Sequence, residues 1–175
     1  RRGGIHLIDM QPRLEGPTLL LRPLQPADRT ALWEVSRDPL IWAQHPNPER
    51  ATPEGFAAFF DAALDSGGAL AVVERATGRI IGTSRYYDWD PEESGVAIGY
   101  TFLARDHWGG AANGEMKRLM LDHALQVVRT VWFHVATTNL RSRRAMEKIG
   151  ARLSHQGPRP AGGIIVDFCY YRIDR

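Results

Sequence analysis

The sequence predicts a mixed α+β fold, and two patterns support that prediction. An apolar run at Gly95–Leu103 leads through a loop of small residues into a long amphipathic helix, and a second apolar run follows at Val131–Ala136. This order is typical of a strand–helix–strand crossover. Two shorter apolar runs, Ala69–Glu74 and Arg79–Tyr87, predict antiparallel strands that precede the crossover.

The N-terminal part is expected to hold a strand, a helix and an irregular loop. The apolar run Thr18–Leu24 predicts the strand. Ala27–Arg37 predicts the helix, which ends ahead of Pro39 because the residue before a proline avoids the helical region. Asp38–Arg50 contains three prolines, so we expect an irregular loop with one helical turn there.

A second helix is expected to begin at Thr52. Thr52 is typical of an N-cap and Pro53 of the first helical position, while Ser66-Gly67-Gly68 marks the end of the helix. The antiparallel strands that follow turn at Thr77-Gly78, and Asp88–Ser94 is expected to form an acidic turn before the crossover.

The C-terminal part is expected to begin with a helix over Leu140–Ile149. Asn139 precedes it as an N-cap, and Gly150 follows it in the position where helices commonly end. Two final strands are expected near Arg152–His155 and Ile164–Arg172, with the connection running through Gly157-Pro158 and Gly162-Gly163.

Length and composition indicate one domain over residues 1–175, with residues 1–16 as a peripheral segment. A net charge of +2 without any block of like charges argues against nucleic acid as a partner. No apolar run approaches the roughly 18 residues that a membrane span needs, and no signal peptide is recognisable. The sequence begins with Arg1 rather than Met, so we expect the native start to be missing or processed.

Cysteine and histidine usage predicts neither a disulfide nor a metal site. Cys169 is the single cysteine, and its apolar neighbours predict a buried, inert thiol in a reduced, cytoplasmic setting. The six histidines show no zinc-ligand spacing, so no metal is expected.

The loop inside the crossover is the first candidate site. It contains the small residues Gly109, Gly110, Ala111, Ala112 and Gly114. Small residues leave backbone N–H groups open at a helix N-terminus, where the helix dipole also favours a phosphate or pyrophosphate. An ordinary tight turn explains the same composition.

Three segments together resemble the GNAT superfamily of acetyl-CoA-dependent N-acetyltransferases, most of all its ribosomal-protein (RimJ/RimL) type. They are AIGYTFL at Ala97–Leu103, WGGAANGEMKRLML at Trp108–Leu121 and NLRSRRAMEKIGA at Asn139–Ala151. The resemblance covers about Thr18 to Arg172. It implies a central mixed, mostly antiparallel sheet of about six or seven strands, with a V-shaped opening between two parallel strands and about four flanking helices.

The resemblance also implies where acetyl-CoA binds. The opening would lie between Gly95–Leu103 and Val131–Ala136, and the pantetheine chain would pair with the main chain at Phe102 and Leu103. The loop would hold the pyrophosphate, with the candidates Trp108, Gly109, Gly110, Ala111, Ala112, Asn113 and Gly114. Ala111 and Asn113 depart from the usual small residues, and Ala111 is tolerated if its φ is negative.

The next helix supplies further candidates. By resemblance, Asn139 contacts the cofactor arm through its side chain, and the same residue can serve as a plain N-cap. Arg141, Arg144 and Lys148 share one stripe of the helix. That stripe either faces solvent or attracts the adenosine 3′-phosphate.

Catalysis by direct transfer, without an acyl-enzyme, needs an uncharged amine and donors for the developing oxyanion. Main-chain N–H groups near Tyr100–Phe102 can serve the oxyanion if the strand bulges there. Ala97 stands where some relatives carry a Glu base. A related type places its base on the second strand, five residues before the Asn, and that position is His134. An unperturbed histidine titrates near 6.5, so we expect a limb in the pH–rate profile at about pH 6–8.

Other residues compete for the catalytic roles or replace them. His134 can instead be a histidine hydrogen-bonded within the sheet, and the acidic turn Asp88–Glu93 offers competing bases. Met146 stands where many relatives place a Tyr acid and has no proton to give. Ser142, three residues after the Asn, can hydrogen-bond the departing sulfur or lie on the helix surface.

The sequence therefore predicts an acetyl-CoA-dependent N-acetyltransferase that acetylates a primary amine, either a protein N-terminus or a small molecule. A non-catalytic acyl-CoA-binding module is the alternative, and a phosphotransferase ranks lower because the lysine-containing phosphate loop is missing. Trp42–Arg50 and Asp88–Glu93 are expected to wall the acceptor pocket. Dimers are common in the family, so a homodimer is considered.

Overall fold

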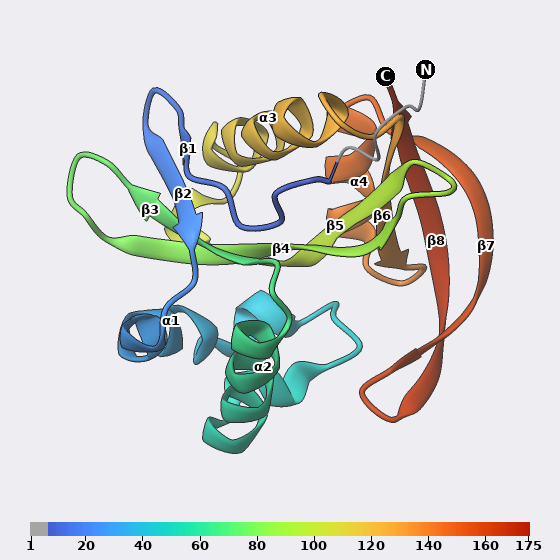
Figure 1. Cartoon of the computed structure of the whole chain (residues 1–175). Helices are drawn as coiled ribbons and strands as arrows, with labels where there is room; N and C mark the ends of the chain where they lie inside the picture. The colour runs from blue at the N-terminus through green and yellow to red at the C-terminus, as the bar shows by residue number, and fades with distance from the viewer. Residues whose placement is uncertain (1–6) are drawn as a thin grey trace.

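The computed structural model describes residues 7–175, which form an eight-stranded sheet with helices on both faces (Figure 1). The strands are β1 Leu14–Glu15, β2 Leu19–Pro23, β3 Ala69–Glu74, β4 Ile80–Asp90, β5 Gly95–Leu103, β6 Thr130–Ala136, β7 Arg152–Ala161 and β8 Ile164–Asp174. The α-helices are α1 Arg29–Ser36, α2 Pro53–Asp65, α3 Ala112–Leu125 and α4 Leu140–Lys148. Single 3-10 turns occur at Pro26–Asp28, Pro39–Trp42, Pro48–Ala51 and Arg105–His107.

The sheet order is β1-β2-β3-β4-β5-β6-β8-β7, and every neighbouring pair is antiparallel except β5 and β6. The predicted fold class is confirmed: the sheet is mixed and mostly antiparallel, with one parallel pair joined by the crossover helix α3. The strand count is eight rather than six or seven. The additional strand is β1, a two-residue edge pairing with β2.

A hydrophobic core packs against each face of the sheet. In β3, Leu70 and Val72 join one core, whereas Ala69, Ala71 and Val73 join the other. Successive strand residues point to opposite faces, so one strand can serve both cores. The helices α3 and α4 cover one face, and α1 and α2 cover the other (Figure 1).

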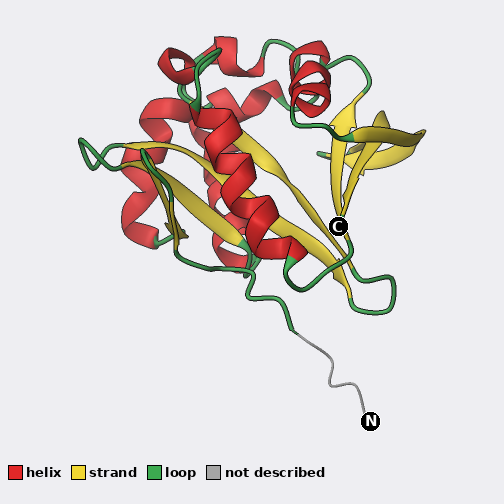
Figure 2. Cartoon of the chain, turned by 90° about the horizontal axis from the view of Figure 1, so that it is seen from above, coloured by secondary structure: helices red, strands yellow, loops and turns green. Residues whose placement is uncertain are grey.

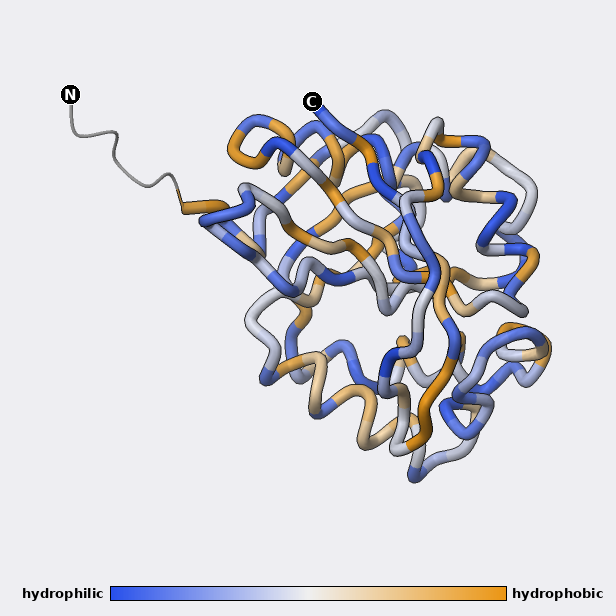
Figure 3. Tube along the Cα trace, turned by 90° about the vertical axis from the view of Figure 1, so that its right-hand side faces the viewer, coloured by the Kyte–Doolittle hydropathy of each residue, from blue (hydrophilic) through white to orange (hydrophobic). Residues whose placement is uncertain are grey.

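The helices bury an apolar face and leave a polar face outside. Figure 2 shows them from above, laid over the strands, and Figure 3 shows hydrophobic and hydrophilic residues alternating along the trace. In α2, the buried residues are Phe56, Phe59, Phe60 and Ala63, which recur at helical spacing. Thr52 caps this helix as predicted, because its Oγ1 accepts a 3.1 Å hydrogen bond from the N–H of Gly55.

The N-terminal segment packs against the sheet where the structure describes it. Ile8 is buried in the core beside α3, and Gln11 donates a 3.0 Å hydrogen bond to the carbonyl of Ala69. Residues 7–16, part of the segment expected to be peripheral, include β1 at the sheet edge. Residues 1–6 of that expected segment lie outside the described residues.

The C-terminal hairpin differs from the expectation. Gly157-Pro158 was expected in the connection, but both residues lie inside β7. The turn falls at Gly162-Gly163, where both φ angles are positive (59° and 82°). β7 forms the edge of the sheet, where a proline without an N–H is tolerated.

Strands β5 and β6 separate part-way along their length. They pair only at Gly95–Thr130, Val96–Val131 and Ala97–Trp132, although β5 continues to Leu103 and β6 to Ala136. The opening predicted between two parallel strands is therefore present. β5 also carries a bulge opposite β4, and Tyr100 within it has φ of 52°.

Candidate active site

A cavity of about 250 Å³ lies where β5 and β6 separate. Its walls come from both strands, from α3 and α4, from the loop before α2, and from the β7–β8 hairpin. The polar and charged side chains that line it are His45, Asn47, Arg50, Tyr87, Tyr100, Thr101, Lys117, His134, Asn139, Ser142 and Arg159. Within the described residues, no carboxylate lines this cavity.

The N-terminus of α3 offers a row of free donors. Within residues 7–175, the backbone N–H groups of residues 111–114 have no hydrogen-bond acceptor, and no side chain caps the helix. Ala111 has φ of −79°, so a residue with a side chain fits this position, and Gly109 takes the positive φ of 75°. These donors and the helix dipole suit an anion such as a pyrophosphate.

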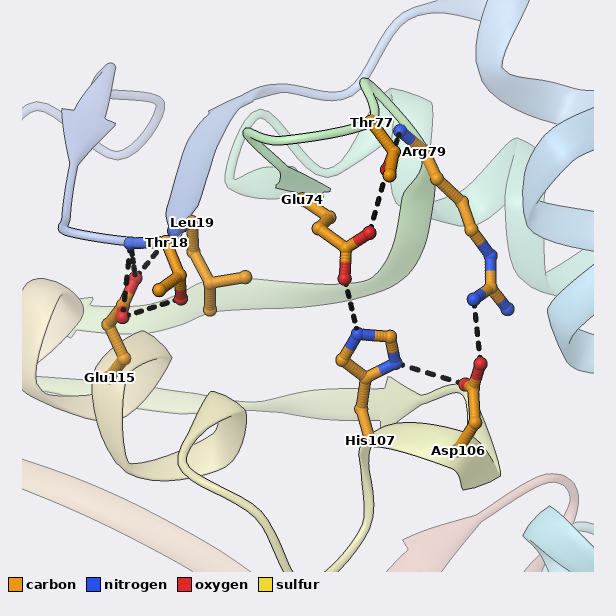
Figure 4. A network of polar contacts seen from close by, with 8 residues as sticks. All are labelled: Thr18, Leu19, Glu74, Thr77, Arg79, Asp106, His107 and Glu115. Atoms are coloured by element: carbon orange, nitrogen blue, oxygen red, sulfur yellow. Dashed lines mark hydrogen bonds and ion pairs between the residues drawn. The ribbon is translucent and has the colours of Figure 1, made fainter.

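Two groups of polar contacts, one at Glu115 and one at His107, hold this loop and helix against the sheet (Figure 4). The carboxylate of Glu115 accepts hydrogen bonds from the N–H groups of Thr18 and Leu19 and from the hydroxyl of Thr18. His107 lies 2.8 Å from Glu74 and 3.0 Å from Asp106, measured to the carboxylate oxygens. The hydrogen bonds to the two acids raise the pKa of His107 against the opposing effect of burial.

The N-terminus of α4 lies on the cavity. Asn139 is 8% exposed, and its Oδ1 accepts a 3.3 Å hydrogen bond from the N–H of Ser142. The predicted N-cap is thus confirmed. No described residue accepts a hydrogen bond from the Nδ2 of Asn139, although the side chain lines the cavity. Ser142 lines the cavity as well, and so does Met146.

His134 lies on β6 and faces the cavity. Its Nδ1 is 2.9 Å from the hydroxyl of Tyr87, and its ring contacts those of Tyr87 and Tyr170 edge-on. Gly99 leaves the room for this phenol, because a Cβ there would lie 3.0 Å from the Tyr87 ring. Burial, and then the charge of Arg159, lowers the pKa of His134 to about 4. Burial raises the pKa of Tyr87, so the phenol is neutral at neutral pH.

The sequence match settles the family. Residues 18–152 match the family model of the acetyltransferase (GNAT) domain. The chain belongs to this family. GNAT domains use acetyl-CoA.

Solved structures of other GNAT proteins share the fold. A GCN5-related N-acetyltransferase from Brucella melitensis superposes with a TM-score of 0.80 at 21% identity, over 94% of this chain and 79% of that one. A GNAT acetyltransferase from Bacillus anthracis gives a TM-score of 0.77 at 20% identity, over 93% and 98% of the two chains. A ribosomal-protein-S5-alanine acetyltransferase from Vibrio fischeri gives 0.70 at 15% identity, over 93% and 96%. A search of curated proteins finds no match by sequence.

The predicted cofactor residues of this GNAT domain fall into two groups. Asn139 and Ser142 line the cavity, whereas Phe102, Leu103, Trp108 and residues 109–114 lie outside it. Phe102 and Leu103 pair with Thr83 and Gly82 of β4. The Nε1 of Trp108 donates a 3.0 Å hydrogen bond to the carbonyl of Leu103, and the guanidinium carbon of Arg141 lies 3.7 Å from the centroid of the Trp108 ring. Trp108 therefore links the end of β5, the loop and α4.

Of the two segments expected to wall the acceptor pocket, one lines the cavity. The loop before α2 lines the cavity through His45, Asn47 and Arg50. The acidic turn Asp88–Glu93 does not line it, because Asp88 is directed to an ion pair with Arg159 at 3.1 Å. The acidic turn therefore contributes no carboxylate to the lining of the cavity.

Sequence reasoning missed Lys117. This lysine is 4% exposed, and its Nζ donates a 3.2 Å hydrogen bond to the Oγ1 of Thr101 on the bulged part of β5. Burial lowers its pKa to about 8. The signal in the sequence was its spacing from Met120 and Ala124, which puts a lysine on the buried face of α3.

Among residues 7–175, no three histidine, cysteine or acidic side chains are grouped as metal ligands would be. The described helices include none with the length and apolarity of a membrane span. Cys169 is fully buried in β8, which agrees with the expected buried thiol.

Proposed function

We propose that this GNAT domain is an acetyl-CoA-dependent N-acetyltransferase that passes the acetyl group directly to a primary amine. The observation that carries the proposal is the separation of β5 from β6 beside the free N–H groups of α3. A cofactor with its pyrophosphate on α3 can extend its arm along this opening. The thioester would then reach the cavity, where the loop before α2 and the β7–β8 hairpin leave room for an acceptor.

The cofactor contacts follow from the free donors. In this proposal, the N–H groups of residues 111–114 bind the pyrophosphate, assisted by Trp108, Gly109 and Gly110. The main chain of Phe102 and Leu103 pairs with the pantetheine arm. The Nδ2 of Asn139 donates to the same arm, while its Oδ1 keeps the helix cap.

The reaction needs donors around the carbonyl and the sulfur. Acetyl-CoA supplies an activated acyl group on a thiol that leaves as a thiolate. The bulge at Tyr100 interrupts the pairing with β4, and we assign the main-chain N–H groups there as donors to the developing oxyanion. The hydroxyl of Ser142 is assigned to hydrogen-bond the departing sulfur.

His134 is assigned as the acceptor of the proton that the amine loses. In the tautomer in which Nδ1 donates its proton to the oxygen of Tyr87, the Nε2 is free to accept. Its low pKa keeps the ring neutral at neutral pH, as an acceptor must be, and also makes it a weak base. Proton transfer onward to solvent would complete each cycle.

The finer assignments follow from a structural relative, from cysteine usage and from the sheet topology. The likeness to the Vibrio fischeri ribosomal-protein-S5-alanine acetyltransferase favours a RimJ/RimL-type enzyme. The lone buried Cys169 supports a cytoplasmic, reduced setting. We further propose that residues 1–175 form one domain, because all eight strands join one sheet. A homodimer remains part of the proposal on family resemblance alone.

A thiol-release assay with a broad panel of amines tests the proposed function. Acetyl-CoA should lose its acetyl group only when an acceptor is present, and mass spectrometry should find the acetylated amine. The non-catalytic acyl-CoA-binding module is favoured by the missing carboxylate in the cavity and by Met146. Tight acetyl-CoA binding without turnover on any amine would support that module and reject the enzyme.

A further inference from the structure

Two arginines beside the cavity have no anionic partner among the residues that the structure describes. Arg50 lines the cavity from the 3-10 turn before α2, and Arg85 lies on β4 and is 7% exposed. Within residues 7–175, neither guanidinium forms an ion pair with a carboxylate. The six residues outside that range, RRGGIH, include no acid. Buried charges in proteins are normally paired, so this pair needs a physical reason.

Both guanidinium groups stack on the same two aromatic rings. The Arg85 carbon lies 3.9 Å from the Tyr100 centroid and 5.7 Å from that of Phe59. The Arg50 carbon lies 5.8 Å and 4.7 Å from the same centroids. Tyr100 also lines the cavity, so the rings connect the arginines to it.

Stacking leaves most of the hydrogen-bond donors of these groups without a partner. A guanidinium has five N–H donors around its edge, and an aromatic ring covers only its face. The Nε of Arg85 is buried without a partner. Among the residues that the structure describes, the one polar contact within hydrogen-bond distance of the Arg50 guanidinium is His45 Nε2, at 3.5 Å. Burial is the main cause that lowers the pKa of both arginines, which shows how little compensation the protein supplies.

The place of the arginines separates them from the proposed cofactor site. Phe59 belongs to α2 and packs in the core of the α1–α2 face, whereas α3 and α4 cover the opposite face. A pyrophosphate on the N-terminus of α3 has its own donors in residues 111–114. The unpaired charge therefore lies on the side of the cavity left for the acceptor.

We infer that the acceptor is an amine that also carries an anionic group, a carboxylate or a phosphate, which Arg50 binds directly. Arg85, which stacks on Tyr100, adds positive electrostatic potential beside the same site. The planar fork of a guanidinium matches both oxyanions. This inference rests on the proposed function for the amine and adds the class of acceptor.

The test compares matched charged and neutral ligands. One pair is a free amino acid and its amide, and the other is 2-aminoethyl phosphate and 2-aminoethanol. The wild-type enzyme should prefer the charged member of at least one pair in kcat/KM, and the preferred pair identifies the oxyanion. Arg50→Gln should reduce that preference about 10- to 100-fold, the range expected for a lost charge-assisted hydrogen bond. The KM for acetyl-CoA should stay within about twofold.

Arg29→Gln is the matched control. Arg29 also stacks on a phenylalanine, 5.4 Å from the Phe60 centroid, but it lies on α1 away from the cavity. It should leave the preference for the charged substrate unchanged. Arg50→Lys keeps the charge without the fork and should retain part of the preference, which guards against a folding defect in the glutamine variant.

Calorimetry separates this inference from the proposed function. An N-acetylated amino acid and its amide can be titrated into the protein with CoA present, and no turnover is required. Preferential binding of the acid that is lost in Arg50→Gln supports the anion site even if no amine is acetylated. Equal treatment of charged and neutral ligands by the wild-type protein, in both transfer and binding, would overturn it.

Discussion

At the scale of single residues, His134 shows what a position in the sequence can predict and what it cannot. Its place on the second strand of the parallel pair was predicted, and the structure brings it to the cavity. Its environment could not be predicted, because Tyr87, Tyr170 and Arg159 approach it from distant parts of the chain. Burial, and then the charge of Arg159, lowers the pKa to about 4, well below the value near 6.5 assumed from the sequence.

His134→Gln is expected to lower kcat by roughly 10²–10⁴-fold with little change in acetyl-CoA binding. Since only the neutral ring accepts a proton, activity should fall as the pH drops through about 4, and not at 6–8. The variant should lose this acid limb in a pH–rate profile. His155→Gln is the control, because His155 is exposed and stacks on Tyr170 outside the cavity. A wild-type profile in His134→Gln would reject His134 as the proton acceptor.

Lys117→Met tests the buried lysine. The pKa of Lys117 is about 8 in the folded protein, below its ordinary value of 10.5, so between these values the unfolded chain binds more protons. The free energy of unfolding should therefore rise by about 1–3 kcal/mol as the pH rises through this window. This gain in stability should be lost as the pH falls through the same window. Denaturant titrations at pH 8 and 10 should show this rise in the wild type and a smaller one in the variant. An identical rise in both proteins would mean that Lys117 is well solvated.

At the scale of elements, local sequence patterns predicted the helices and strands whose ends carry recognisable residues, such as helix caps. The bounds of β3 and β5 and the caps at Thr52 and Asn139 were predicted as found. β7 was cut short in the prediction because Gly157-Pro158 normally marks a turn, and its place at the sheet edge was not visible. β1 is too short to leave a pattern.

Gly110→Glu tests the loop at the start of α3. A Cβ at Gly110 would have its nearest neighbour at 3.8 Å, so a side chain fits. An acidic residue near a helix N-terminus favours the dipole, so stability should hold. The same charge opposes a pyrophosphate, and calorimetry should show an acetyl-CoA Kd raised about 10-fold or more. Gly110→Ala should bind as the wild type does, and unchanged affinity in Gly110→Glu would remove the pyrophosphate from this loop.

Asn139→Ala tests whether the cap of α4 also binds the cofactor. Loss of the cap should cost about 1 kcal/mol of unfolding free energy, and loss of the Nδ2 donor should raise the Kd for acetyl-CoA. Thr52→Ala removes the equivalent cap from α2 at a residue that does not line the cavity, and should lower stability with the affinity intact. If both variants keep wild-type affinity, Asn139 is a cap only.

At the scale of the whole molecule, the sequence predicted which two strands would separate but not what would surround the opening. The β7–β8 turn approaches the loop before α2 so closely that a Cβ at Gly162 would lie 2.1 Å from the Nδ2 of Asn47. These segments are far apart in the chain, and no local pattern connects them. The same holds for Arg50 and Arg85, whose shared aromatic partners lie on α2 and β5.

The central claim is that acetyl-CoA lies in the opening between β5 and β6, with its pyrophosphate on α3 and its thioester in the cavity. A crystal structure of the protein with acetyl-CoA tests this most directly. The account predicts phosphate oxygens within hydrogen-bond distance of the N–H groups of residues 111–114, and the sulfur beside Ser142. A cofactor bound elsewhere, with those N–H groups left without an acceptor, would contradict it.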